Sequence, residues 1–97
     1  MNFEVAPKST EMKLNWADAK QYVEKLSIDG KTGWRLPTKE ELNEIYESRN
    51  DFEETWYWSS TENNGGCAWF QNFYNGNQGN FNKNNGYDYV RAIRDIK

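Results

Sequence analysis

The sequence predicts a single α+β domain, in which two helices precede a small antiparallel β-sheet. Three observations support this: the 97 residues match the length of one domain, the first half has two segments with helical apolar spacing, and the second half has β-rich runs with Asn-Gly turns between them. The mean hydropathy of −1.12 alone would suggest disorder. Aromatic residues make up 16% of the chain, however, and each can bury a large apolar area. We therefore expect residues 1–97 to fold as one domain with an aromatic core.

Both helices of the first half have N-terminal capping signals. Asn15 can cap a helix with Asp18 at its third position. The apolar residues that follow predict a helix over residues 16–27, with one face formed by Trp16, Ala19, Val23 and Leu26. Thr38 and Glu41 form a capping box for a second helix over residues 38–48. Residues 33–37 between them should be extended, because the residue before a proline avoids helical dihedral angles.

The second half predicts strands at residues 56–61, at 68–74, around 81 and at 87–96. Asn75-Gly76 and residues 84–86 should form turns, because Asn and Gly tolerate positive φ. Phe3 and Val5 alternate with polar residues near the start of the chain. This alternation favours pairing of the first strand with the last one at a sheet edge.

The composition excludes several classes of chemistry. The chain has no His and one Cys, Cys67, so we expect no His-based catalysis, no disulfide within the chain and no His- or Cys-ligated metal. Neighbouring carboxylates such as Glu53 and Glu54 do not face one another on a helix. The net charge of −3 gives no reason to expect a nucleic-acid partner. No apolar run approaches the roughly 20 residues that span a bilayer, and residues 1–10 lack the stages of a signal peptide. We expect no enzymatic activity, no metal and no cofactor.

Five segments of the chain occur in the order of one known sequence pattern. They are LNWADA from Leu14, GWRLPTKEEL from Gly33, YWSSTE from Tyr57, the segment from Ala68-Trp69 through Phe73 to Gly76, and YVRAIR from Tyr89. Together they resemble the C-terminal domain of bacterial collagen-like adhesins, which has the C-type-lectin fold. The resemblance covers nearly the whole chain. It implies paired termini in one sheet, two helices and a loop-rich face that binds ligands.

Two other classes of protein with the same fold have sites whose residues can be looked for in this chain. Sugar-binding C-type lectins use acidic calcium motifs and formylglycine-generating enzymes use paired cysteines, and the chain has neither. The resemblance therefore implies a calcium-independent binding module without catalysis.

Variable proteins of diversity-generating retroelements share the fold and are mutated mainly at Asn codons near the C-terminus. Residues 63–87 hold nine Asn and are similar to such a region in its unmutated form, although ordinary members also have Asn-rich loops.

Several side chains within the quoted strings are expected to serve packing. Trp16, Trp34 and Trp58 should lie in the core. Arg35, with Arg91 and Arg94, should bind carbonyl groups or acids inside the fold, because a guanidinium offers five fixed donors.

The strongest functional signal is the polar and aromatic surface of residues 70–89. Residues 63–87 have one charged residue, Lys83, whereas residues 1–62 hold 13 of the 15 acidic residues. Tyr with Asn and Gly is typical of adaptable binding loops. Turn chemistry accounts for Asn75 and for Asn85-Gly86, but it accounts poorly for the Asn residues at 72, 80 and 82. The predicted ligand-binding residues are Asn72, Tyr74, Asn77, Gln78, Asn80, Asn82, Asn84, Asn85 and Tyr87.

These observations predict a non-enzymatic ligand-binding module whose partner is a protein receptor or a glycan. Tyr74 and Tyr87 would anchor the ligand, and linked copies would gain avidity, which favours a homo-oligomer. A diversity-generating-retroelement variable protein is one version of this hypothesis. The alternative is a structural or assembly domain of a virion or cell-surface complex. The resemblance favours a cell or particle surface, including that of a phage.

Overall fold

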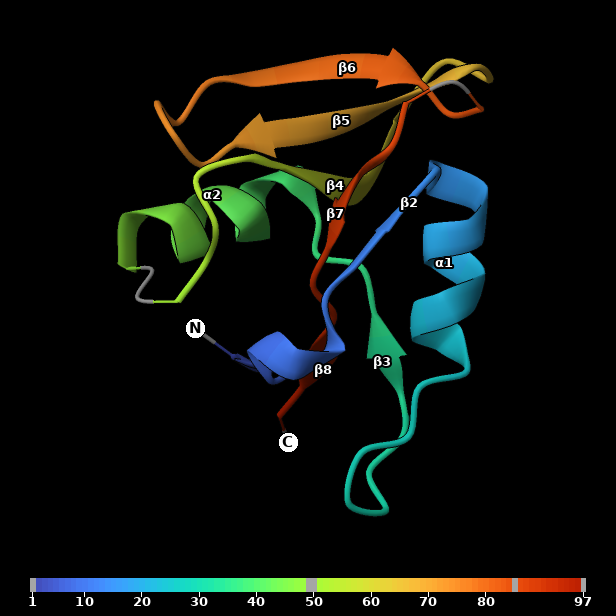
Figure 1. The fold of residues 1–97 in the computed structure, drawn as a ribbon, viewed down its shortest axis with the longest axis vertical. Coiled ribbons are helices and arrows are strands. Elements are labelled where there is room, and N and C mark those ends of the chain that lie inside the picture. Colours follow the sequence, from blue (N-terminus) through green and yellow to red (C-terminus); the bar gives the residue numbers. More distant parts are fainter. Residues whose placement is uncertain (1, 49–50, 85, 97) are drawn as a thin grey trace.

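Figure 1 shows a computed structural model that describes residues 2–48, 51–84 and 86–96. The described residues form an α+β fold, as the sequence predicts. The helices are α1 (Trp16–Glu24), α2 (Lys39–Ser48) and the short 3₁₀ helix η1 (Lys8–Thr10). The strands are β1 (Phe3–Val5), β2 (Met12–Leu14), β3 (Trp34–Arg35), β4 (Trp56–Asn63), β5 (Cys67–Asn72), β6 (Gln78–Asn82), β7 (Asp88–Val90) and β8 (Ile93–Asp95).

The strands form two sheets, with orders β1-β8-β3 and β2-β7-β4-β5-β6. The antiparallel pairing of β1 with β8 confirms that the first and last strands lie together. The larger sheet is mixed, and in this respect the predicted purely antiparallel sheet is wrong: β4 and β7 run parallel, with Tyr57 beside Tyr89. β7 does not follow β4 through a hairpin turn: the chain forms the β5–β6 hairpin on one side of β4 and then crosses to the other side, and a crossover connection allows parallel pairing.

The predicted caps of both helices are present. The side chain of Asn15 accepts a hydrogen bond from the Asp18 N–H at 2.9 Å. Thr38 and Glu41 bind reciprocally, at 2.8 and 3.1 Å, as a capping box. α1 ends at Glu24, three residues before the predicted end. It ends early because residues 28–31 form a tight turn instead, with Asp29 and Gly30 at φ of 51° and 80°.

The predicted last strand, residues 87–96, is broken into β7 and β8, which belong to different sheets. The N-terminal segment is broken at the matching place, because Pro7 and η1 separate β1 from β2. β1 pairs with β8 and β2 pairs with β7, so both segments bend together. The Arg91 side chain occupies this bend and donates to the Ala6 carbonyl at 2.6 Å.

The core lies on both faces of the larger sheet. On one face, α1 packs Trp16, Ala19 and Val23 against Trp58 and the neighbouring Trp34. On the other face, α2 packs Leu42 and Ile45 against Tyr57, Phe73, Phe3 and Ile93. Trp58 and Tyr57 are adjacent in β4 and point to opposite faces. The prediction that Trp16, Trp34 and Trp58 are core residues is confirmed. In the described part of the chain, no helix has the length and apolarity needed to cross a membrane.

Candidate functional site

The β5–β6 hairpin carries most of the predicted ligand-binding residues. β6 is the outer strand of the larger sheet (Figure 1). The predicted turn at Asn75-Gly76 is confirmed, but it lies within a longer connection of residues 73–77. The Gly76 N–H donates to the Asn72 carbonyl at 2.7 Å, and Gly76 has φ of +83°. A Cβ at this position would lie 2.7 Å from the Tyr46 ring, so the turn also requires glycine for space.

The strand register assigns the hairpin side chains to two faces. Gln71 and Trp69 of β5, with Gln78, Asn80 and Asn82 of β6, belong to the face that α2 covers; we call it the α2 face. The opposite α1 face, which α1 covers only in part, carries Ala68, Phe70, Gly79 and Phe81.

Side-chain amide groups on the α2 face of the hairpin form hydrogen bonds to α2. The buried Gln71 side chain donates to Asn43 Oδ1 at 3.0 Å and to the Gly76 carbonyl at 3.1 Å. Gln78 donates to the Lys39 carbonyl at 2.7 Å and to Gln71 Oε1 at 3.2 Å. The ammonium group of Lys39 lies 3.8 Å from the centroid of the Trp69 ring. Gln78, a predicted ligand-binding residue, therefore contributes to hairpin attachment.

Turn chemistry accounts for more of the Asn residues than the sequence indicated. Asn72 Oδ1 accepts from the Tyr74 N–H and Asn82 Oδ1 accepts from the Asn84 N–H, each at 2.8 Å. Asn75 makes the same contact with the Asn77 N–H at 2.9 Å. These are Asx turns, in which the side chain replaces a backbone acceptor. The prediction that turns explain Asn72 and Asn82 poorly is therefore wrong.

Asn77, Asn80 and Asn84 are exposed, as expected of recognition residues. Asn77 lies in the connection between β5 and β6, Asn80 lies in the middle of β6, and Asn84 lies in the turn after β6. Asn85, the remaining predicted Asn, lies outside the described residues.

The two predicted anchors are exposed but are not neighbours. Tyr74 is 70% exposed and Tyr87 is 59% exposed. Tyr74 lies in the connection that leads into β6, and Tyr87 lies in the connection that follows β6. These two connections lie at opposite ends of β6 (Figure 1). Five strand residues at about 3.3 Å each separate these connections. The tyrosines therefore belong to opposite ends of one elongated surface and do not form one cluster.

Sequence reasoning missed an aromatic strip on the α1 face. Trp56, 41% exposed, stacks on Phe70 with ring centroids 4.8 Å apart and planes at 13°. Phe81, on the neighbouring strand, is 42% exposed. Gly79 allows the Phe70 ring to lie over β6, because a Cβ there would be 3.0 Å from the ring. The sequence did contain a signal for this strip. Trp56 lies two residues before the core residue Trp58, so both belong to the same face of β4.

A model of the Lcl C-terminal domain family matches residues 4–94, which extend from β1 to β8. The chain belongs to the Lcl C-terminal domain family. The match includes the hairpin and both of its flanking connections. No curated protein matches the chain.

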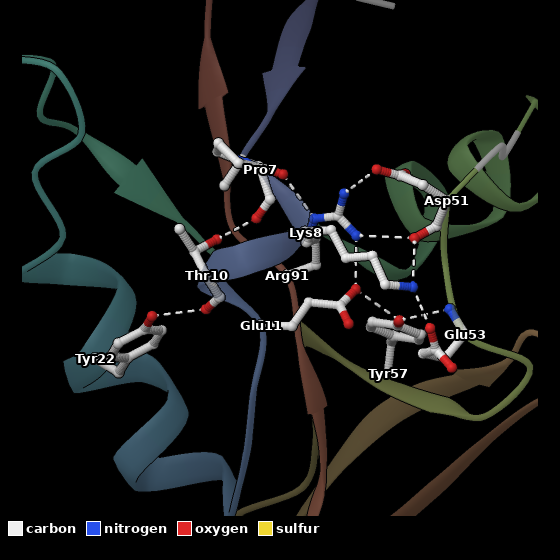
Figure 2. A network of polar contacts seen from close by, with 10 residues as sticks. Pro7, Lys8, Thr10, Glu11, Tyr22, Asp51, Glu53, Tyr57 and Arg91 are labelled. Atoms are coloured by element: carbon white, nitrogen blue, oxygen red, sulfur yellow. Dashed lines mark hydrogen bonds and ion pairs between the residues drawn. The ribbon is translucent and has the colours of Figure 1, made fainter.

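In this member of the Lcl C-terminal domain family, the Arg91 side chain holds the bent segments together (Figure 2). It is 2% exposed and donates to Ala6 O, to Glu11 Oε2 at 2.6 Å and to Asp51 Oδ2 at 2.8 Å. Glu11 also accepts a hydrogen bond from the Tyr57 hydroxyl at 2.7 Å, and burial raises the pKa of Tyr57. The Arg91–Glu11 pair is buried, and removal of one partner of a buried pair typically costs about 3–5 kcal/mol. The network thus ties residues 6–11 to residues 51–57 and to the β7–β8 bend.

The other predicted structural arginines also have acidic partners. Arg35 binds Glu41 through two bonds of 2.8 and 2.9 Å and binds Asp95 at 2.7 Å. Hydrogen bonds from Arg35 lower the pKa of Glu41. Arg94 binds Glu4 at 2.7 Å and the Thr32 carbonyl. The prediction of structural roles for Arg35, Arg91 and Arg94 is confirmed.

Outside the hairpin, the described carboxylates and two hollows show no comparable concentration of recognition groups in this Lcl C-terminal domain. Glu53 pairs with Lys8, and Glu40 is exposed at the start of α2. Two shallow hollows, of about 100 and 190 Å³, lie beside α1 and beside β1. Both are smaller than the roughly 300–1,000 Å³ of a typical small-molecule site. Among the described Cys, Asp and Glu residues, no group of three could hold a metal ion.

Proposed function

We propose that this chain is a non-enzymatic ligand-binding domain whose recognition surface is the β5–β6 hairpin with its two flanking connections. We call this the hairpin surface. It consists of Trp56, Phe70 and Phe81 on the α1 face, Asn80 on the α2 face of the same edge strand, and Tyr74, Asn77, Asn84 and Tyr87 in the two connections. One observation carries the proposal. Of the six large apolar side chains that are exposed among the described residues, four belong to this surface: Trp56, Tyr74, Phe81 and Tyr87.

Exposed aromatic rings beside amide groups are suited to recognition. Tyr and Trp provide large, rigid contact areas at small entropic cost, and Asn provides both donors and acceptors. The core and the helix caps account for Trp16, Trp34, Arg35 and Glu41, whereas nothing in the described packing requires Tyr74 or Tyr87 to be aromatic. This contrast supports a binding role for the hairpin surface.

The chemistry of the surface favours an uncharged epitope on a protein receptor or a glycan. Residues 63–87 carry one charged side chain, Lys83, which pairs with Glu62. Calcium usually requires several carboxylate oxygens among six to eight ligands. We therefore propose calcium-independent binding. The paired termini and the two helices support assignment of the chain to the C-type-lectin fold within this proposal.

Diversification would be an extension of the same function. Asn72, Asn75 and Asn82 hold turns through their side chains, although Asn75 and Asn82 are also exposed. Asn77, Asn80 and Asn84 are exposed and form no such side-chain turn among the described residues. If a retroelement diversifies the gene, substitutions should concentrate at the second group and at the aromatic positions beside it. Sequencing of the gene from related strains, with a search for a near-duplicate of its 3′ end beside a reverse transcriptase, tests this extension.

The binding proposal is tested with fluorescently labelled domain, linked into tetramers for avidity, on glycan arrays and on arrays of surface proteins. We expect a hit that survives a calcium chelator. The double variant Tyr74→Ala/Tyr87→Ala and the single variant Trp56→Ala should each lose binding by about tenfold or more, as buried aromatic anchors do. Met12→Ala, an exposed apolar residue on β2, is the matched control and should bind normally.

Far-ultraviolet circular dichroism and the thermal unfolding midpoint of each variant should show an unchanged fold. Equal binding by the wild-type domain and the hairpin variants would contradict the proposed surface. The absence of any ligand, together with a stable higher assembly, would favour the alternative of an assembly domain.

A further inference from the structure

From Gln78 to Phe81, the outer edge of β6 lacks the features that normally protect an edge strand, whereas at its end the Gly86 N–H donates to the Asn82 carbonyl at 3.1 Å. Among the described elements, only β5 pairs with β6 (Figure 1). Exposed edges are usually blunted by charged residues, proline or bulges, because their N–H and C=O groups can pair with another chain. β6 reads Gln-Gly-Asn-Phe-Asn and has a regular register with β5. At the opposite edge of the sheet, by contrast, β2 carries Lys13.

The hydrogen bonds that flank the hairpin show which backbone groups face outward. The Asn72 N–H donates to the Asn77 carbonyl at 2.8 Å, and the Lys83 N–H donates to the Gly66 carbonyl at 3.0 Å. Bonded and non-bonded pairs alternate along an antiparallel ladder. Gly79 and Phe81 therefore bond to β5, whereas Gln78 and Asn80 direct their backbone N–H and C=O groups to the free edge.

We propose that β6 pairs antiparallel with β6 of a second copy of this chain, around a two-fold axis at Asn80. The two five-stranded sheets then join into one continuous sheet. The Asn80 residues of the two copies face each other and exchange two backbone hydrogen bonds. Gly79 faces Phe81 of the second copy. Gln78 faces Asn82 of the second copy, whose carbonyl already accepts a hydrogen bond from the Gly86 N–H of its own chain, so the Asn80 pair carries the interface.

The side chains of β6 are complementary to themselves in this register. On the α2 face, amides meet amides, each of which can donate and accept. On the α1 face, each Phe81 meets Gly79, over which the Phe70 ring already lies. The Trp56–Phe70 stack thus continues across the axis to the second copy's Phe81. β6 carries no charge, so no like charges oppose one another although the chain has a net charge of −3.

This self-complementarity is why the proposed occupant is a second copy. When two copies of β6 pair antiparallel around Asn80, the small residue Gly79 lies opposite the large residue Phe81. The amide side chains of β6 then lie opposite amide side chains. An interface of one short strand per copy is small, at or below the roughly 1,200 Å² of the smallest stable interfaces. We therefore expect a reversible dimer whose population depends on protein concentration.

Sedimentation velocity over a wide concentration range measures the dimer. Asn80→Pro removes an outward N–H without removing a bond to β5, and Asn80→Lys adds an edge charge. Each should weaken self-association by about tenfold or more, which corresponds to the loss of one or two hydrogen bonds. Asn2→Lys makes the same charge change at the exposed N-terminal end and should dimerise normally.

Amide hydrogen exchange gives a second readout that a general loss of stability would not reproduce. As the protein concentration rises, exchange at Asn80 should slow, whereas exchange at Phe81, which already bonds to β5, should not change. A wild-type chain that stays monomeric at millimolar concentration would overturn the proposal. So would a dimer that tolerates both Asn80 variants. The ligand assay uses Tyr74, Tyr87 and Trp56 instead, so the proposed function and the dimer can fail separately.

Discussion

Asp88 is a buried carboxylate that the fold places opposite Leu14 in the β2–β7 pair. Within the described residues, its Oδ2 atom has no hydrogen-bond partner. Burial raises the pKa of Asp88 to about 6, although the charge of Lys13 acts in the opposite direction. In the unfolded chain the carboxyl should titrate near its ordinary value. Between these two values the folded state binds the proton more tightly, so stability falls as pH rises through this window.

The variant Asp88→Asn should therefore be more stable than the wild-type chain above pH 6. A shift of about two pKa units corresponds to a gain on the order of 1–3 kcal/mol at neutral pH. The gain should disappear as the pH falls toward 4, where the wild-type carboxyl is protonated in both states. Urea unfolding at several pH values measures this. Asp18→Asn, an exposed acid in the first turn of α1, is the control and should show no such gain. A destabilised Asp88→Asn variant at neutral pH would indicate that the carboxylate has a stabilising partner.

At the scale of elements, the β5–β6 hairpin depends on the conformation of its connection. Gly76 has φ of +83°, and a Cβ would lie 2.7 Å from the Tyr46 ring of α2. Gly76→Ala should therefore cost about 1–2 kcal/mol from the left-handed backbone alone, with a further cost for displacement of Tyr46. Gly33→Ala is the matched control, because Gly33 has a similar φ of +85° and its Cβ would meet no atom within 4 Å. Chemical denaturation compares the two variants, and equal effects would show that the Tyr46 contact does not constrain the turn.

The sequence predicted elements whose signals are local. The caps at Asn15 and Thr38 depend on contacts three residues apart, and the turn at Gly76 depends on local dihedral angles. The break between β7 and β8 could not be predicted in this way, because it depends on Arg91 reaching Ala6, 85 residues away along the chain. The exposure of Trp56 is likewise tertiary. Its neighbour Trp58 has the same strand pattern, and only the position of α1 separates a core ring from a surface ring.

At the scale of the whole molecule, the N-terminal and C-terminal strands stabilise the fold together. β8 lies between β1 and β3, so the first and last strands and the segment between the helices share one sheet. The Arg91 network then links this sheet to Glu11 and Asp51 (Figure 2). The hairpin surface lies at the far edge of the other sheet and contributes few buried side chains. The architecture therefore separates the residues that hold the fold from those proposed to bind ligands.

Ile93 tests this separation, because it is fully buried in β8 and pairs with Val5 on one side and Arg35 on the other. Ile93→Ala should cost about 2–5 kcal/mol through lost burial and the cavity that remains. β8 connects both ends of the chain. We therefore expect the unfolding curves followed by tryptophan fluorescence and by far-ultraviolet circular dichroism to have the same lowered midpoint, as in one cooperative transition. Ile96→Ala removes the same side chain from an exposed position two residues beyond β8's centre and should change stability by no more than about 0.5 kcal/mol. If Ile93→Ala separated the two transitions, the hairpin would unfold independently of the paired termini.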